Sequence, residues 1–150
     1  MKPHYFFSLI IFCVLLDAIT KISAEKYLLS EIILIPHFLS LEYIRNPWIA
    51  FSIPVTGIFL KIITIVLIFW IIYYYRKEEK RKKNIYIDIS FWLILAGAIG
   101  NAWERILRNS VTDFISLQNF AIFNIADSCI TLWAILFAFT IFQEQHKKKT

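Results

Sequence analysis

GIFLKIITIVLIFWIIYYY, residues 57–75, is an apolar segment whose single charged side chain is Lys61. A helix that crosses the hydrocarbon core of a bilayer needs about 20 mainly apolar residues. This segment has that length and that composition. It ends in the aromatic stretch WIIYYY, and aromatic side chains of this kind gather where a membrane meets water. The segment therefore predicts a transmembrane helix.

Three further segments have the same character and predict three more spans. They cover residues 5–23, 85–103 and 124–142. The first of them could instead be a cleaved signal peptide. A signal peptide needs small residues at a cleavage site just after its apolar core, and Asp17 interrupts the segment there. We therefore expect a retained helix, and a single membrane domain over residues 1–150 with four transmembrane helices.

The composition agrees with a membrane protein. Hydrophobic residues make up 59% of the 150 residues, and the mean hydropathy is +0.63, whereas a soluble domain is about 45–50% apolar. The formal net charge of +5 could indicate a nucleic-acid partner. However, the charges lie in short clusters between apolar segments, as they do at a membrane surface, so no nucleic-acid binding is expected. Cys13 and Cys129 lie within apolar segments and predict small buried side chains, and no metal site is expected.

The basic residues predict the orientation of the four spans. Placing both termini in the cytoplasm puts ten of the 16 basic residues on the inner side: Lys2, Arg76, Lys77, Lys80, Arg81, Lys82, Lys83, Lys147, Lys148 and Lys149. Cytoplasmic loops of membrane proteins carry this excess of lysine and arginine. Two outer segments remain, residues 24–56 and 104–123. Within the first, IILIPHFLSLEYI at 32–44 is rich in β-branched and aromatic residues and predicts short strands at the membrane surface.

Polar residues gather at one depth, near the outer ends of all four predicted helices: Asp17, Lys21, Lys61, Asn101, Arg105, Asn124 and Asp127. Ionisable side chains inside a membrane are costly and usually functional. Each pair also has a local explanation. Asp17 and Lys21 stand one helical turn apart and can form an ion pair. Asn124 and Asp127 suit the start of a helix, as cap and first-turn acid. Convergence of four helices on one level favours a functional site.

Two carboxylates near this level suggest its chemistry. Asp127 follows Asp113 by 14 residues, and a loop of that length can fold back and bring the two side chains together. Two close carboxylates share a proton, because both cannot ionise at short range. The ionised one can activate a water while the protonated one polarises a peptide carbonyl. No Gly-x-Ser-x-Gly motif frames any serine, although a lysine could in principle activate one. The pattern favours an aspartic peptidase.

At these residues the chain resembles the lipoprotein signal peptidase (signal peptidase II) family. LLDAITK at 15–21 resembles the first-helix motif D-x-x-[TS]-K, and RNPWIAFSI at 45–53 resembles N-T-G-A-A-F. AGAIGNAWERI at 96–106 resembles G-G-A-x-G-N-x-x-D-R, VTDFI at 111–115 resembles V-V-D-F, and FNIADSCI at 123–130 resembles F-N-x-A-D-S. Each motif alone is modest, but five in order over nearly the whole chain are highly specific.

The resemblance implies a catalytic dyad of Asp113 and Asp127, with no cofactor. It also implies a set of residues that bind substrate or support the site: Asp17, Lys21, Asn46, Asn101, Glu104, Arg105 and Asn124. Family members cut the signal peptide from diacylglyceryl-modified prolipoproteins, just before the lipidated cysteine. The expected partners are therefore lipid-modified prolipoproteins and membrane lipids, for a chain that acts as a monomer.

The expected fold is an all-α membrane protein with four transmembrane helices and a small β-rich extracytoplasmic cradle. The resemblance implies the bacterial cytoplasmic (inner) membrane, with both termini cytoplasmic and the active site at the outer leaflet. Glu104 stands where the family has Asp, and Pro47, Trp48 and Ile49 replace T-G-A, which removes the backbone freedom of the glycine. Two alternatives stay open: a weakened or inactive relative that binds lipidated peptides, and a small channel or transporter subunit.

Overall fold

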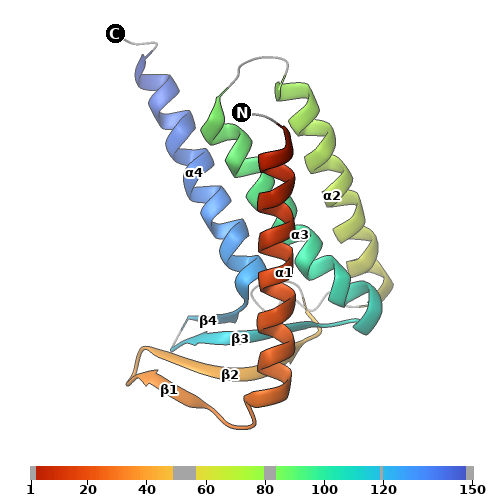
Figure 1. The fold of residues 1–150 in the computed structure, drawn as a ribbon, viewed down its shortest axis with the longest axis vertical. Helices are drawn as coiled ribbons and strands as arrows, with labels where there is room; N and C mark the ends of the chain where they lie inside the picture. Colours follow the sequence, from red (N-terminus) through yellow and green to blue (C-terminus); the bar gives the residue numbers. More distant parts are fainter. Residues whose placement is uncertain (1–2, 49–56, 80–83, 119, 148–150) are drawn as a thin grey trace.

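The computed structural model describes residues 3–48, 57–79, 84–118 and 120–147. In chain order the described elements are α1 (Pro3–Tyr27), β1 (Ile32–Ile35), β2 (Leu39–Asn46), α2 (Gly57–Glu79), α3 (Ile85–Arg108), β3 (Val111–Leu117), β4 (Ala121–Phe123) and α4 (Ile125–Lys147). The four helices form a bundle, and the strands form a sheet across one end of it (Figure 1). That end is called the sheet end below, and the opposite end the far end.

Each described helix contains a stretch that is long and apolar enough to cross a membrane. All four helices run past their predicted C-terminal ends at residues 23, 75, 103 and 142. α1 runs to Tyr27 and α3 to Arg108. The added turns contain alanine, glutamate, lysine, leucine and arginine, which favour helix, and no glycine or proline. α3 stops at Asn109, which has a left-handed backbone (φ 57°) and donates its N–H to the Arg105 carbonyl.

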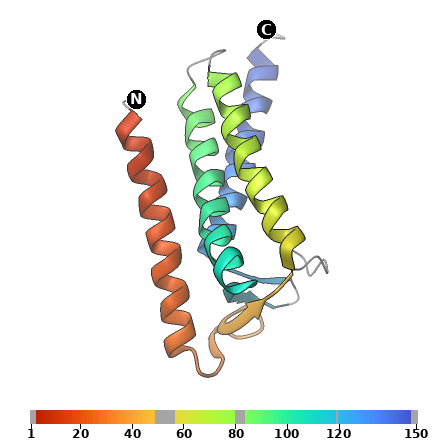
Figure 2. The ribbon, with the colours of Figure 1, turned by 90° about the vertical axis from the view of Figure 1, so that its right-hand side faces the viewer.

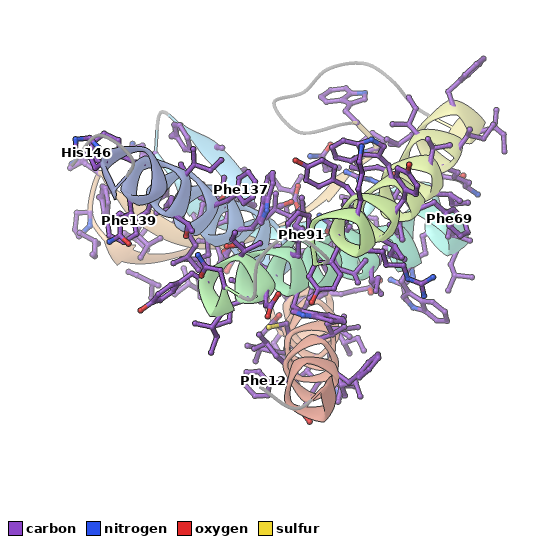
Figure 3. The ribbon with its side chains drawn as sticks, turned by 90° about the horizontal axis from the view of Figure 1, so that it is seen from above. Phe12, Phe69, Phe91, Phe137, Phe139 and His146 are labelled. Atoms are coloured by element: carbon purple, nitrogen blue, oxygen red, sulfur yellow. The ribbon has the colours of Figure 1, made fainter. Side chains whose placement is uncertain are left out.

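α3 is the central helix of the bundle. It packs against α1, α2 and α4, and 50% of its most apolar stretch is buried, against 17% to 22% for the other three helices. α1 leans away from the rest toward its N-terminal end and approaches them at the sheet end (Figure 2). The outward helix surfaces are strongly apolar. Phe12 on α1 and Phe69 on α2 point away from the bundle, whereas Phe91 lies inside it (Figure 3).

The sheet is antiparallel, with strand order β1-β2-β3-β4. The strands predicted within residues 32–44 are present as β1 and β2. The sequence did not predict β3 and β4, which occupy half of the second outer segment. These two strands join the sheet ends of α3 and α4, so that β3 carries Asp113 and β4 ends just before Asn124. The sheet thus fixes the part of the chain that contains both carboxylates of interest.

Candidate active site

Polar side chains are buried together at the sheet end of the bundle. One hydrogen-bonded group of them, each with less than a tenth of its surface exposed, consists of Asp17, Lys21, Asn101, Glu104, Thr112, Asp113 and Asn124. They come from α1, α3, β3 and the residue before α4. Asp127, in the first turn of α4, is half-buried beside them. The convergence on one level that the sequence predicts is therefore present, and every buried member except Thr112 was named from the sequence.

Asn124 connects the two predicted catalytic aspartates. Its Nδ2 donates to Oδ1 of Asp113 over 2.7 Å. Its backbone N–H donates to Oδ2 of Asp127 over 3.3 Å, and the Asp127 N–H donates back to Oδ1 of Asn124 over 2.9 Å. The second pair of bonds caps the start of α4. The capping interaction therefore also places Asp127 beside Asn124, whose side chain holds Asp113.

Asn101 holds Asp127 from the other side. Its Nδ2 donates to Oδ1 of Asp127 over 2.8 Å, while its Oδ1 accepts from the Lys21 ammonium over 2.9 Å. The same oxygen accepts from Nδ2 of Asn124 over 3.2 Å. A lysine has donors and no acceptor, so the Lys21 contact fixes which end of the Asn101 amide faces Asp127. The orientation of the Asp127 carboxylate is therefore set by a charge on a different helix.

Asp17 and Lys21 form the ion pair that their spacing predicts, with Nζ and Oδ2 2.7 Å apart. The pair also ties helices together, because Oδ1 of Asp17 accepts from the backbone N–H of Ala126 in α4 over 2.8 Å. Gly97 and Gly100 permit this close packing. A Cβ at Gly97 would collide with the Ala126 carbonyl oxygen, and one at Gly100 would lie 2.7 Å from Oδ2 of Asp17.

Glu104 anchors the beginning of β3. Its Oε2 accepts from the backbone N–H of Thr112 over 2.7 Å, and its Oε1 accepts from the Thr112 hydroxyl over 2.9 Å. Lys21 lies 3.6 Å from Oε2. The longer arm of Glu104, where the family motif has Asp, therefore meets a hydroxyl at a position where the motif has Val. Thr112 could have been suspected from the sequence only as a polar residue in an otherwise apolar strand beside Asp113.

Asp113 is buried and accepts two amide hydrogen bonds, from Asn124 and from Nδ2 of Asn46, which is 2.9 Å from its Oδ2. Burial is the largest influence on this carboxyl and raises its pKa to about 6. The charge of Asp127 adds to the rise, while the two amide bonds and the Lys21 charge oppose it. Asp113 is therefore a carboxyl that can hold a proton near neutral pH.

The remaining predicted residues lie around this core. Arg105 is partly buried and interacts electrostatically with Asp113 and Asp127, and its Nε is buried without a hydrogen-bond partner among the described residues. Lys61 does not join the site, because it donates to the Ile106 carbonyl at the end of α3 over 2.8 Å. The Trp48 side chain is exposed, and the backbone N–H of Trp48 donates to Oδ1 of Asn46. Pro47 follows β2, and Ile49 lies outside the described residues.

This arrangement defines a class of protein. Two carboxyl groups lie at the end of a bundle of membrane-spanning helices, joined through one asparagine, and one of them is suited to hold a proton. These are the components of an aspartic peptidase built on a bundle of membrane-spanning helices.

A family model described as signal peptidase (SPase) II matches residues 9–143. The chain is 39% identical over 132 residues to a lipoprotein signal peptidase of Caldicellulosiruptor bescii, covering 86% of this chain and 85% of the relative. It is 36% identical to the lipoprotein signal peptidase of Chlorobaculum tepidum, covering 94% and 98%. A bacterial membrane enzyme solved at 2.3 Å by the in meso method superposes with a TM-score of 0.87, at 29% identity, over 97% of this chain and 92% of that one.

The chain belongs to the signal peptidase II family. It is a multi-pass membrane protein and an aspartic-type peptidase, and the function predicted from the sequence, removal of signal peptides from lipoproteins, is confirmed at this level. The predicted fold class is confirmed as well. The alternative of a binding-only relative is not favoured.

Proposed function

We propose that Asp113 and Asp127 are the catalytic dyad of this peptidase, and that it cuts diacylglyceryl-modified prolipoproteins just before the lipidated cysteine. The observation that carries the dyad is that Asn124 bonds both carboxyl groups, through its Nδ2 to Asp113 over 2.7 Å and through its backbone N–H to Asp127 over 3.3 Å. One residue thereby couples two aspartates that lie on different elements, β3 and α4.

The proposed reaction needs no covalent intermediate. Asp127 takes a proton from a water molecule, which attacks the scissile carbonyl carbon, while protonated Asp113 donates its proton to the carbonyl oxygen. The tetrahedral intermediate then collapses. Asp127 passes its proton to the leaving nitrogen, the C–N bond breaks, and Asp113 recovers its proton from the intermediate's hydroxyl. The raised pKa of Asp113, about 6, supports its role as the proton donor.

Arg105 is proposed to bind the substrate backbone beside the dyad, and Asn46 is proposed to support Asp113. Arg105 has a buried Nε that lacks a partner among the described residues, and buried polar groups are normally hydrogen-bonded. A peptide carbonyl of the bound substrate would satisfy it. The remaining predicted residues keep the dyad in place: Asp17, Lys21, Asn101, Glu104 and Asn124.

The membrane position of the site is also a proposal. The dyad lies where α3 and α4 meet the sheet, at one limit of the apolar spans. The excess of basic residues at the opposite end supports a cytoplasmic location of both termini in the bacterial inner membrane. The active site would then face the outer leaflet, where the cleavage site of a membrane-inserted signal peptide lies. The chain is proposed to act there as a monomer, in contact with membrane lipids.

A gel-shift cleavage assay tests this proposal. Purified protein in detergent is mixed with a diacylglyceryl-modified prolipoprotein, or with the same precursor lacking the lipid. We expect cleavage of the lipidated form only, and a fall of at least about 1000-fold in Asp113→Asn and in Asp127→Asn. Asp88→Asn is the matched control, because Asp88 lies in the first turn of α3 at the far end and its loss should leave cleavage unchanged. Normal turnover by either dyad variant would refute the assignment.

A further inference from the structure

The carboxylate of Glu25, in the last turns of α1, accepts hydrogen bonds from two arginine side chains. Nη2 of Arg45 in β2 lies 2.8 Å from Oε1, and Nη1 of Arg108 in α3 lies 2.6 Å from Oε2. All three side chains are partly exposed, at 36% to 42% of their surface. The sheet end of α1 lies close to β2 (Figure 1). The carboxylate therefore ties β2 to two helices of the bundle.

The guanidinium of Arg45 is fixed by each of its three nitrogens. Besides the bond to Glu25, Nε donates to the Tyr43 hydroxyl over 2.8 Å, and Nη1 donates to the Ser110 hydroxyl over 3.3 Å. The planar, forked donors of arginine allow one side chain to hold several partners in a set geometry. A side chain with every nitrogen bonded restrains the strand that carries it.

The next residue, Asn46, contacts the proposed dyad. Successive side chains of a strand point to opposite faces, so Arg45 and Asn46 reach in opposite directions from the end of β2. Asn46 donates to Asp113 over 2.9 Å. The β2–β3 register shifts between Leu41 and Ile44, and only the pairs Ile44–Asp113, Arg45–Thr112 and Asn46–Val111 follow that shift. Beyond the register shift, the end of β2 is held to β3 by three residue pairs. A further contact can therefore affect its position.

We propose that the Glu25–Arg45 pair is a positioning clamp, which holds Asn46 against Asp113 by fixing the end of β2 to α1. This inference rests on the proposed dyad. Glu25 and Arg45 touch neither carboxyl of the dyad and act through Asn46. Without the clamp, Asn46 loses its fixed distance from Asp113, and the proton donor is no longer held in one place relative to the scissile carbonyl.

The clamp should have a signature in the pH profile. The charged groups around Asp113 are Asp127 on α4, Lys21 on α1 and Arg105 on α3, and the Asn46 amide adds a hydrogen bond that favours the ionised carboxyl. Losing that bond raises the pKa of Asp113. Because Asp113 must be protonated to donate, activity falls as pH rises past its pKa. Clamp variants should therefore keep their activity to a higher pH than the wild type.

The experiment compares pH profiles of kcat and KM for Arg45→Gln and Glu25→Gln with those of the wild type, in the lipidated-substrate assay. We expect kcat to fall about 5- to 20-fold with little change in KM, and the alkaline limb to move up by roughly 0.5–1 pH unit. The double variant should shift no further than either single one. Arg45→Lys keeps the charge but cannot bind three partners, so it should behave like Arg45→Gln.

Two matched controls separate positioning from charge and from folding. Lys26→Gln removes a neighbouring charge on α1 that lies over the Tyr27 ring and should keep the wild-type profile. Arg108→Gln removes the other partner of Glu25 and should leave the alkaline limb in place. Melting temperatures should match throughout, since exposed pairs contribute little to stability. The clamp would be overturned if the alkaline limb of the pH profile kept its wild-type position in both Arg45 variants. It would also be overturned if Arg45→Lys restored wild-type kinetics in full. Normal turnover by Asp113→Asn would instead refute the dyad on which the clamp rests.

Discussion

The two ends of the helix bundle are built from different interactions. At the sheet end, charged and amide side chains from α1, α3 and α4 are buried in one hydrogen-bonded network around Asp113 and Asp127. Toward the far end, α2, α3 and α4 pack through an apolar cluster that includes Ile71, Phe91 and Ile94. Phe91 alone makes ring contacts with Tyr74, Tyr75 and Phe137. One sequence thus contains a polar core and an apolar core within the same bundle.

The difference shows how stability and chemistry are divided in this protein. In lipid, packing apolar helix faces together costs little free energy but gains none from the hydrophobic effect. Buried polar groups raise the free energy unless they are paired. The sheet end contains such buried polar groups, and their network orients the carboxyl groups of Asp113 and Asp127. At the far end the Tyr75 hydroxyl donates to Oδ1 of Asp88 over 3.2 Å, which joins α2 to α3 beside the apolar cluster. Substitutions should therefore act differently at the two ends.

The largest effect on stability should come from Lys21→Met at the sheet end. Lys21 is 3% exposed and lies 2.7 Å from Asp17, 2.9 Å from Asn101 and 3.6 Å from Glu104. Its removal leaves the buried Asp17 carboxylate without its cation and leaves Glu104 only the Arg108 guanidinium, 3.9 Å away. Breaking a buried pair in this way costs about 3–5 kcal/mol of unfolding free energy, measurable by denaturant titration in detergent, and activity should be lost.

Lys61→Met is the control for that prediction. Lys61 lies on α2 near the same depth but donates only to the Ile106 carbonyl, so its loss should cost about 1 kcal/mol or less. Asp17→Asn in the Lys21→Met background should recover part of the stability by removing one unpaired charge. Equal losses in the two lysine variants would mean that the buried network does not distinguish the sheet end.

The second prediction concerns pH. The pKa of Asp113 is raised by burial from 3.8 to about 6, so the folded state binds this proton more tightly than the unfolded chain. The stability contribution is then full below pH 4, falls as pH rises toward 6 and levels off above it. The fall should be on the order of 2–3 kcal/mol.

Melting temperatures of wild type and Asp113→Asn at pH 4.5 and pH 7.5 check this sign. The difference between the two proteins should move in favour of the variant as pH rises, because the variant has no carboxyl to ionise at this position. Asp88→Asn retains Asp113, so the contribution of Asp113 to the pH dependence of its melting temperature should match that of the wild type. A difference that is constant across pH, or that moves toward the wild type, would show that Asp113 is not forced to ionise in a buried place.

The sequence was sufficient for those parts of the fold and site that depend on composition or short spacing. The four helices follow from their apolar segments, and the Asp17–Lys21 pair follows from one helical turn. The contacts that complete the site join residues far apart in the chain. Asn46 and Asp113 are separated by 67 positions, and Lys21 and Asn101 by 80. The family resemblance named these residues without giving their partners.

Other features were missed for identifiable reasons. β4 has three residues, too few to show a pattern of alternation. Thr112 precedes Asp113 in an apolar strand, and nothing local shows that it binds Glu104. Glu25 and Arg45 look like ordinary surface charges, because their pairing depends on how the sheet sits against α1. In each case the missing information is the geometry between elements, which short sequence patterns do not contain.

The smallest effect should come from Phe91→Leu, within the apolar cluster. Phe91 is 6% exposed and contacts rings on α2 and α4 (Figure 3). Leucine keeps most of the volume but loses the aromatic contacts, which are worth about 0.5–1.5 kcal/mol per pair. We expect a loss of about 1–2 kcal/mol in unfolding free energy and a kcat/KM within about twofold of wild type, measured by thermal unfolding and the cleavage assay. The same unfolding loss at the sheet end would be accompanied by a large loss of activity, since Asp127 and Asn101 are held by that network. If Phe91→Leu instead lowered kcat while the melting temperature stayed constant, the apolar cluster would itself set the geometry of the dyad through α3, and the division between the two ends would not hold.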